Sequence, residues 1–197
     1  RVLNDDTVSG GTGFDLHPHN NMEIVTIVLQ GALEHRDSLG NIQVINPGEV
    51  QVMSAGTGLY HAEYNHSANE AVKFFQLWIF PREKGLKPRY DQKLFDTQQL
   101  RNTAVMLVTP DNRQQAGALW IHQDAFISTI ALEKGDEFNY RLNIQGNGVF
   151  VMNVEGEAAV ETNVLQRRDA TAISDTDTLR VTAGETSKLL FIEIPMQ

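Results

Sequence analysis

Two short segments of the sequence combine histidine and carboxylate side chains at a spacing suited to metal binding. The segment "HPH" carries His17 and His19, and the segment "HAE" carries His61 and Glu63. Alternate residues of a β-strand project from the same face, about 7 Å apart along the strand. Because neighbouring strands lie about 4.8 Å apart, two such pairs side by side would form a patch of four ligands. Three imidazoles and one carboxylate suit Fe, Mn, Co, Ni, Cu or Zn.

Each pair taken alone has a plainer interpretation, as an exposed loop or a satisfied polar pair. Both pairs follow glycine-rich turns, "GGTGF" and "SAGTGLY", and this shared setting favours a metal site. Glu23 could also be a ligand by its position, and it competes with Glu63 for the carboxylate role. Of the remaining histidines, we expect His35 to make a hydrogen bond in a turn, His66 to be exposed and His122 to be a structural polar residue.

The composition is that of a globular protein and excludes several functions. Of 197 residues, 41% are hydrophobic, and the net charge of -9 disfavours direct binding to nucleic acid or to an anionic membrane. No apolar run approaches the roughly 18 residues that span a bilayer. The sequence has no cysteine, so any metal must be held by nitrogen and oxygen atoms. We expect a cytoplasmic protein.

The sequence predicts an all-β fold. Most apolar segments are short, rich in Val, Ile and Phe, and bounded by Gly, Pro, Asn or Asp, as in "EIVTIVLQG" and "KLLFIEIP". Residues 35–41, "HRDSLGN", are typical of a hairpin turn. The one predicted helix covers residues 96–103, where an Asp or Thr could cap the N-terminus. Strands at this spacing indicate a sandwich or a small barrel.

The two halves of the chain resemble each other weakly. Gly11 precedes His17 by six residues, and Gly135 precedes Arg141 by the same interval. The segments "KFFQLWIFP" and "KLLFIEIP" also correspond, each ending in proline. An internal duplication of a β-barrel unit explains both correspondences. In the second half, Arg141 and Asn143 stand where the first half has its histidine pair.

The segment over residues 81–92 connects the two repeats. It is basic, contains proline and has no periodicity, so we interpret it as a linker. The predicted domains are therefore 1–85, which carries the metal site, and 86–197, a degenerate copy. No histidine follows Gly156, and we do not expect a second metal.

Two longer motifs carry a family resemblance. Residues 11–23, Gly-x5-His-x-His-x3-Glu, resemble the first cupin motif, and residues 58–65, Gly-x2-His-x3-Asn, resemble the second. More narrowly, "HPHNNMEIVTIVLQGALEHRDSLGN" and "QVMSAGTGLYHAEYN" resemble the pirin family of bicupins. This resemblance implies two β-barrel (jelly-roll) cupin domains, with a metal site in the N-terminal one. It also implies that a further segment precedes "RVLND" in family members.

The resemblance also implies a set of ligands. By position, the family's ligands fall on three histidines and one carboxylate: His17, His19, His61 and Glu63. Glu63 then serves as both ligand and candidate catalytic base, and Glu23 becomes a structural residue. We expect one divalent transition metal, iron first, with Mn, Co, Ni, Cu or Zn as alternatives. The apolar residues expected to line the pocket are Phe14, Met22 and Met53.

The family suggests two main functions. Bacterial pirin-like proteins are similar to enzymes with quercetin 2,3-dioxygenase activity, in which O2 opens a flavonol ring and carbon monoxide is released. The partners would then be a small aromatic, flavonol-like substrate and O2. Animal pirins instead resemble transcriptional co-regulators, in which the redox state of the metal alters a surface that binds a partner protein. A third interpretation is a metal-stabilised scaffold without turnover. We favour the enzyme.

Overall fold

The computed structural model describes residues 2–96 and 101–196, and these are almost entirely β-structure. The one helical element among the described residues is a single 3-10 turn, η1 (Asp111–Arg113). The predicted all-β class is therefore confirmed.

The chain forms two compact units. The first comprises Arg1–Phe95 and Leu119–Gln123, and the second comprises Asp96–Ala118 and Asp124–Gln197. The first unit extends past residue 85 because strand β9 (Arg89–Leu94) pairs with a strand of that unit. The linker predicted over residues 81–92 is therefore wrong from Arg89 onward.

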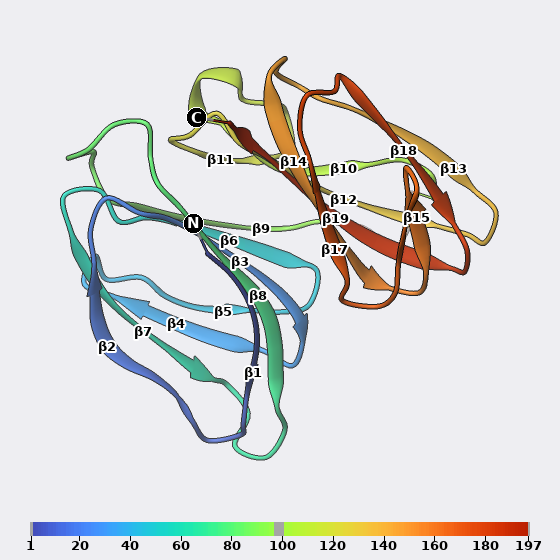
Figure 1. Ribbon diagram of the computed structural model, residues 1–197. Coiled ribbons are helices and arrows are strands. Elements are labelled where there is room, and N and C mark those ends of the chain that lie inside the picture. Colours follow the sequence, from blue (N-terminus) through green and yellow to red (C-terminus); the bar gives the residue numbers. More distant parts are fainter. Residues whose placement is uncertain (1, 97–100, 197) are drawn as a thin grey trace. The chain divides into compact units, whose positions relative to one another are not determined.

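The first unit consists of two antiparallel sheets with the strand orders β1-β8-β3-β6-β9 and β2-β7-β4-β5 (Figure 1). A short strand from later in the chain, β11 (Leu119–Ile121), belongs to the same unit. The other strands are β1 (Val2–Val8), β2 (Gly13–His19), β3 (Glu23–Gln30), β4 (Leu33–Asp37), β5 (Ile42–Ile45), β6 (Glu49–Ser54), β7 (Leu59–Asn65) and β8 (Val72–Ile79).

The second unit repeats this topology. In its larger sheet, the neighbouring strands β12, β19, β14 and β17 correspond in order to β1, β8, β3 and β6 of the first unit. In its smaller sheet, β13, β18, β15 and β16 correspond in the same way to β2, β7, β4 and β5. The match agrees with the internal duplication seen in the sequence. Its strands are β10 (Val105–Pro110), β12 (Phe126–Leu132), β13 (Glu137–Arg141), β14 (Asn147–Glu155), β15 (Ala158–Val160), β16 (Asn163–Leu165), β17 (Ala170–Ile173), β18 (Thr178–Ala183) and β19 (Ser187–Pro195).

Buried side chains of the first unit are arranged in layers along its strands. On β8, Gln76 lies between Phe74 of one apolar cluster and Trp78, which packs against another. On β3, Thr26 likewise separates residues of the two clusters. The first cluster is Val8, Val28, Leu33, Ile45, Val72 and Phe74. The second is Met22, Ile24, Met53, Ala55 and Leu59. The polar layer between them contains the candidate site.

The interior of the second unit is mostly apolar. Fourteen buried residues form one cluster, to which the β19 residues Leu189 and Phe191 and the β18 residue Val181 belong. The ring of Tyr140 stacks on that of Phe191, with centroids 4.6 Å apart and planes at 7°. Hydrocarbon therefore fills most of this barrel, and the buried carboxylate of Glu193 accepts hydrogen bonds from Tyr140 and Asn143.

Two local predictions had different outcomes. The hairpin predicted over residues 35–41 forms between β4 and β5, and Gly40 adopts the φ of +92° that its turn requires. Of the helix predicted over residues 96–103, residues 97–100 lie outside the described residues. The helix is wrong for Arg101, which forms an isolated parallel bridge with Ala131.

The core of the second unit should respond strongly to loss of its central ring. Phe191 is fully buried, so Phe191→Ala removes the stacking on Tyr140 and leaves a cavity. We expect the free energy of unfolding to fall by about 3–5 kcal/mol, measured by urea denaturation. A fall below about 1 kcal/mol would contradict a tightly packed barrel at this point.

Candidate metal centre

A β-bulge in β2 brings the site together. His17 pairs with His61 and Phe14 pairs with Glu63, with a register shift between the two pairs. In a regular strand, residues 14 and 17 would face opposite sides, and the extra residue lets both face the same side. Gly13 permits the close approach of β2 to β7, since a Cβ there would lie 2.3 Å from the carbonyl oxygen of Glu63.

Three imidazoles converge at this point. The ring centroids of His17 and His61 are 4.4 Å apart, those of His19 and His61 are 4.9 Å apart, and those of His17 and His19 are 5.0 Å apart. Each ring offers a nitrogen within 4.8 Å of a nitrogen of the other two. His61 is only 1% exposed, whereas the other two are half-buried. The group is therefore enclosed on the β7 side and partly open on the β2 side.

Three of the six ring nitrogens in this group are buried without a hydrogen-bond partner. His19 Nε2 and both nitrogens of His61 are buried without a hydrogen bond. His17 Nδ1 lies 2.7 Å from the carbonyl oxygen of Asp15, which can only accept, so Nδ1 donates and Nε2 carries the lone pair. A buried polar atom left unsatisfied costs about 1–3 kcal/mol. Three convergent imidazoles with free lone pairs fit a transition-metal ion, which would satisfy them together.

The protonation of these histidines also suits a metal. Burial, with the nearby imidazole of His17, lowers the pKa of His19 to about 4. Burial, with the neighbouring imidazoles of His17 and His19, lowers the pKa of His61 to about 3. Both rings are therefore neutral at pH 7, which is the form that coordinates metals.

Glu63 lies next to the three histidines rather than among them. A carboxylate oxygen of Glu63 lies within 4.8 Å of a ring nitrogen of His35 and of one of His61. Glu63 follows His61 by two residues on β7, whereas His17 pairs directly with His61. Both oxygens accept hydrogen bonds from Gln76 Nε2, at 3.0 and 2.9 Å. Complete burial raises the pKa of Glu63 to about 7, although the bond from Gln76 acts in the opposite direction.

His35 is the residue that sequence reasoning missed. It hydrogen-bonds Asp37 at the start of the hairpin turn, as expected, but it is also fully buried beside His61 and Glu63. Its Nδ1 accepts from Gln51 Nε2 at 3.2 Å and its Nε2 donates to the Asp37 carboxylate at 3.1 Å. Both nitrogens are thus engaged, so His35 presents no free lone pair. The alternation Leu33-x-His35-x-Asp37 was the signal that places it on the inner face.

Glu23 lies on the opposite face of its sheet. Ile24 pairs with Met53 and faces the interior, so Glu23, which pairs with Ser54, faces away from it. The Ser54 hydroxyl donates to the Glu23 carboxylate at 2.7 Å. Glu23 is buried and structural, and it belongs to neither group of candidate ligands.

Of the other side chains named from the sequence, some lie beside the site and others lie away from it. Met22 and Met53 lie in the apolar cluster beside Trp78, and Phe14 is 42% exposed at the edge of the site. His66 is exposed and pairs with Glu34 at 3.0 Å, outside the site. His122 lies in the first unit with its ring against Trp120.

In the second unit, the residues found where the first unit has its histidine pair differ from the predicted Arg141 and Asn143. Arg141, expected in the place of His17, is exposed, and Tyr140 is buried in the interior instead. The reason is that β13 pairs with β18 without a register shift, so it lacks the bulge of β2. Asn143 donates from its side-chain amide to the buried carboxylate of Glu193 at 2.8 Å.

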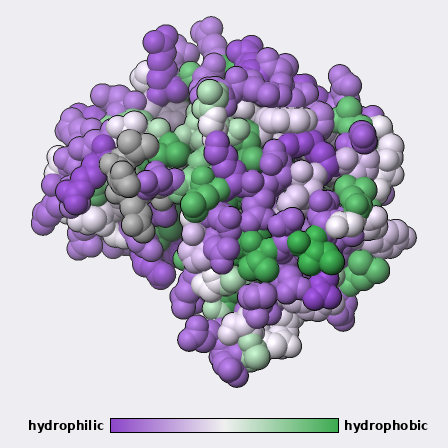
Figure 2. Space-filling view, turned by 180° about the vertical axis from the view of Figure 1, so that it is seen from behind, coloured by the Kyte–Doolittle hydropathy of each residue, from purple (hydrophilic) through white to green (hydrophobic). Residues whose placement is uncertain are grey.

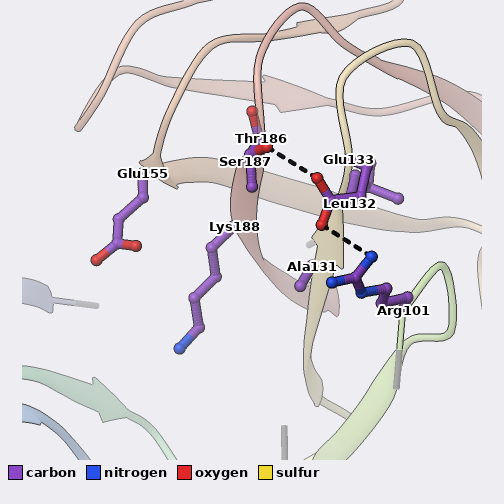
Figure 3. Close-up of a pocket in the computed structure, with 8 residues that line it drawn as sticks. All are labelled: Arg101, Ala131, Leu132, Glu133, Glu155, Thr186, Ser187 and Lys188. Atoms are coloured by element: carbon purple, nitrogen blue, oxygen red, sulfur yellow. Dashed lines mark hydrogen bonds and ion pairs between the residues drawn. The ribbon is translucent and has the colours of Figure 1, made fainter. Parts of the chain in front are cut away.

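A separate cavity of about 330 Å³ lies in the second unit and contains none of the predicted site residues (Figure 3). Glu133 accepts a hydrogen bond from Thr186 at 3.0 Å and pairs with Arg101 at 3.4 Å. The lining residues are Arg101, Ala131, Leu132, Glu133, Glu155, Thr186, Ser187 and Lys188. This mixture of charges lacks histidine, so it does not resemble the centre in the first unit.

The face in Figure 2 is mostly hydrophilic, with hydrophobic residues in small separate areas. Among the described residues, no helix has the length and apolar character needed to cross a membrane.

The fold and the site define a bicupin, with two units of one topology and a candidate metal centre in the first. Residues 1–79 match the family model described as Pirin. Residues 106–194 match the model described as the quercetinase C-terminal cupin domain. The chain belongs to the pirin family, as the sequence motifs predict.

Individual relatives agree with this assignment. A quercetin 2,3-dioxygenase of Escherichia coli (strain K12) is 38% identical over 195 residues, which cover 99% of this chain and 82% of that protein. The crystal structure of YhhW from Escherichia coli matches with a TM-score of 0.93 at 37% identity, covering 100% of this chain and 82% of that one. A structure of the bacterial pirin YhhW from Escherichia coli in complex with nickel(II) matches with a TM-score of 0.91 at 36% identity and the same coverage.

In the metal-free protein, the imidazoles of His19 and His61 should stay neutral as the solution is acidified. Their folded-state pKa values of about 4 and about 3 lie below the ordinary value of 6.5. Below pH 6.5 the unfolded chain therefore binds more protons, and these residues make the free energy of unfolding fall as pH drops toward 4. An NMR titration of the histidine ring resonances measures the protonation directly. Protonation of His61 near pH 6.5 would contradict the enclosed site.

Proposed function

We propose that this chain is a metal-dependent dioxygenase of the quercetin 2,3-dioxygenase type, which opens a flavonol ring with O2 and releases carbon monoxide. The observation that carries the proposal is the three-histidine group, with its unpartnered nitrogens, beside the buried carboxylate of Glu63. The quercetin 2,3-dioxygenase name of a relative 38% identical supports the same activity.

His17, His19 and His61 would hold the metal, and Glu63 would be the carboxylate ligand. We propose a single divalent transition metal, iron first, with Mn, Co, Ni, Cu or Zn as alternatives; the nickel(II) complex of a pirin relative supports a metal of this group. When bound, such an ion supplies Lewis acidity that favours loss of the flavonol hydroxyl proton, and open positions for substrate and O2.

The chain's own residues would supply the remaining steps. Glu63 would accept the flavonol hydroxyl proton, because its buried carboxylate lies beside the three-histidine group. The partly open β2 side leaves room for a substrate to approach His17 and His19. Phe14, exposed at the edge and paired with Glu63, offers an aromatic surface for a flavonol ring.

The activity can be tested by O2 uptake and carbon monoxide release with quercetin, after reconstitution with Fe2+ and with each alternative metal. His61→Ala and Glu63→Ala should each lower turnover by at least about 100-fold, because each removes a group that contacts the metal or the reacting proton. Elemental analysis should find one metal per wild-type chain and less in His61→Ala.

His66→Ala is the matched control. It removes an exposed imidazole that pairs with Glu34 outside the site, so turnover and metal content should match the wild type. Metal-loaded protein that consumes no oxygen with any of a panel of flavonols would overturn the enzyme proposal. That result would favour a metal-dependent regulator with a protein partner.

A further inference from the structure

Two side chains of β8 are arranged around Glu63 in a fixed order. Gln76 is 6% exposed, and its Nε2 donates to both carboxylate oxygens of Glu63. Its Oε1 accepts a hydrogen bond of 2.9 Å from Trp78 Nε1. An indole nitrogen can only donate, so the amide oxygen of Gln76 must face Trp78 and the amide nitrogen must face Glu63. The hydrogen bond from Trp78 therefore fixes the orientation of the Gln76 amide, with its nitrogen toward Glu63.

Trp78 also touches the histidine group directly. Its ring meets that of His19 edge to face, with centroids 4.9 Å apart and planes at 78°. Gln76 and Trp78 are two residues apart on one strand, so both project from the same face. A single strand of the facing sheet therefore contacts one histidine and, through an amide, the neighbouring carboxylate.

The second unit provides an internal comparison. β19 corresponds to β8 in the sheet order, and aligning the segments from Lys73 and Lys188 sets Phe191 against Gln76 and Glu193 against Trp78. The amide and the indole are thus absent from the barrel that has no histidine group. The pair accompanies the candidate centre and is not a requirement of the shared topology.

We propose that Gln76 and Trp78 are positioning residues of the metal centre: Trp78 orients the Gln76 amide, and Gln76 holds both oxygens of Glu63 so that β8 sets how the carboxylate faces the histidines. The inference rests on the metal centre of the proposed function. Partners that orient a ligand are typically worth about 10- to 100-fold in metal affinity.

The test measures metal binding rather than turnover. Gln76→Leu removes both donors at similar volume, and Trp78→Phe removes the indole N–H but keeps an aromatic ring against His19. We expect Ni2+ affinity, measured by competition with a chromophoric chelator, to fall about 10- to 100-fold in Gln76→Leu and less in Trp78→Phe. Because Trp78 reaches Glu63 only through Gln76, the double variant should bind Ni2+ within about threefold of Gln76→Leu.

A spectroscopic readout separates positioning from a general loss of stability. The visible absorption of the Co2+-loaded protein reports ligand number and geometry. The spectrum of Gln76→Leu should shift toward that of Glu63→Gln. Trp120→Phe is the control, because this residue packs against Arg89 instead. The control should keep the wild-type spectrum and affinity.

The outcomes distinguish this inference from the function on which it rests. If the wild type binds Ni2+ and Co2+ but Gln76→Leu has the wild-type affinity and spectrum, the positioning role is wrong and the centre stands. If the losses of Ni2+ affinity in the two single variants multiply in the double variant, Trp78 does not act through Gln76, and that part of the proposal is wrong. If the wild type takes up neither metal, the centre itself is wrong, and this inference fails with it.

Discussion

The polar side chains inside the first unit must find partners without water, and the rest of that unit depends on this constraint. A buried polar group without a partner costs about 1–3 kcal/mol. Gln51 and Asp37 satisfy His35, and Gln76 satisfies Glu63. Among the described residues of this interior, His19 Nε2, both nitrogens of His61 and Gln51 Oε1 are buried without a partner, and the histidine nitrogens belong to the three-imidazole group. A metal ion there would take one lone pair from each imidazole, so unpartnered nitrogens of this interior are also its candidate ligands.

The two units show that one topology can enclose either a candidate metal centre or a mostly apolar core. Four neighbouring strands of each larger sheet, and the strands of the smaller sheets, follow the same order. In the first, strand β8 presents an amide and an indole to a carboxylate and a histidine, whereas β19 presents Phe191 to an apolar cluster. Topology alone therefore says little about activity, which depends on the side chains that face inward.

Small features of strand pairing decide which side chains meet. The bulge in β2 directs His17 toward His61 while leaving Phe14 opposite Glu63, and β13 has no such shift. A change of one residue in register exchanges the two faces of a strand. For this reason equal sequence spacing placed Arg141 in the wrong environment, and Tyr140 is the residue that faces the interior. Bulges leave little trace in a single sequence, so spacing could not reveal this one.

The sequence alone determined the β-rich class, the duplicated unit, and the pairs that supply the histidines, because these follow from alternating apolar residues, turn glycines and local motifs. It also determined that nitrogen and oxygen are the available ligands, since the chain has no cysteine. Only the tertiary structure decided that Glu63 is offset from the three histidines, that His35 is buried beside it, and that Gln76 and Trp78 face it from another sheet. These contacts join residues that are distant in the chain, and their geometry depends on register and on sheet packing, which no local pattern encodes.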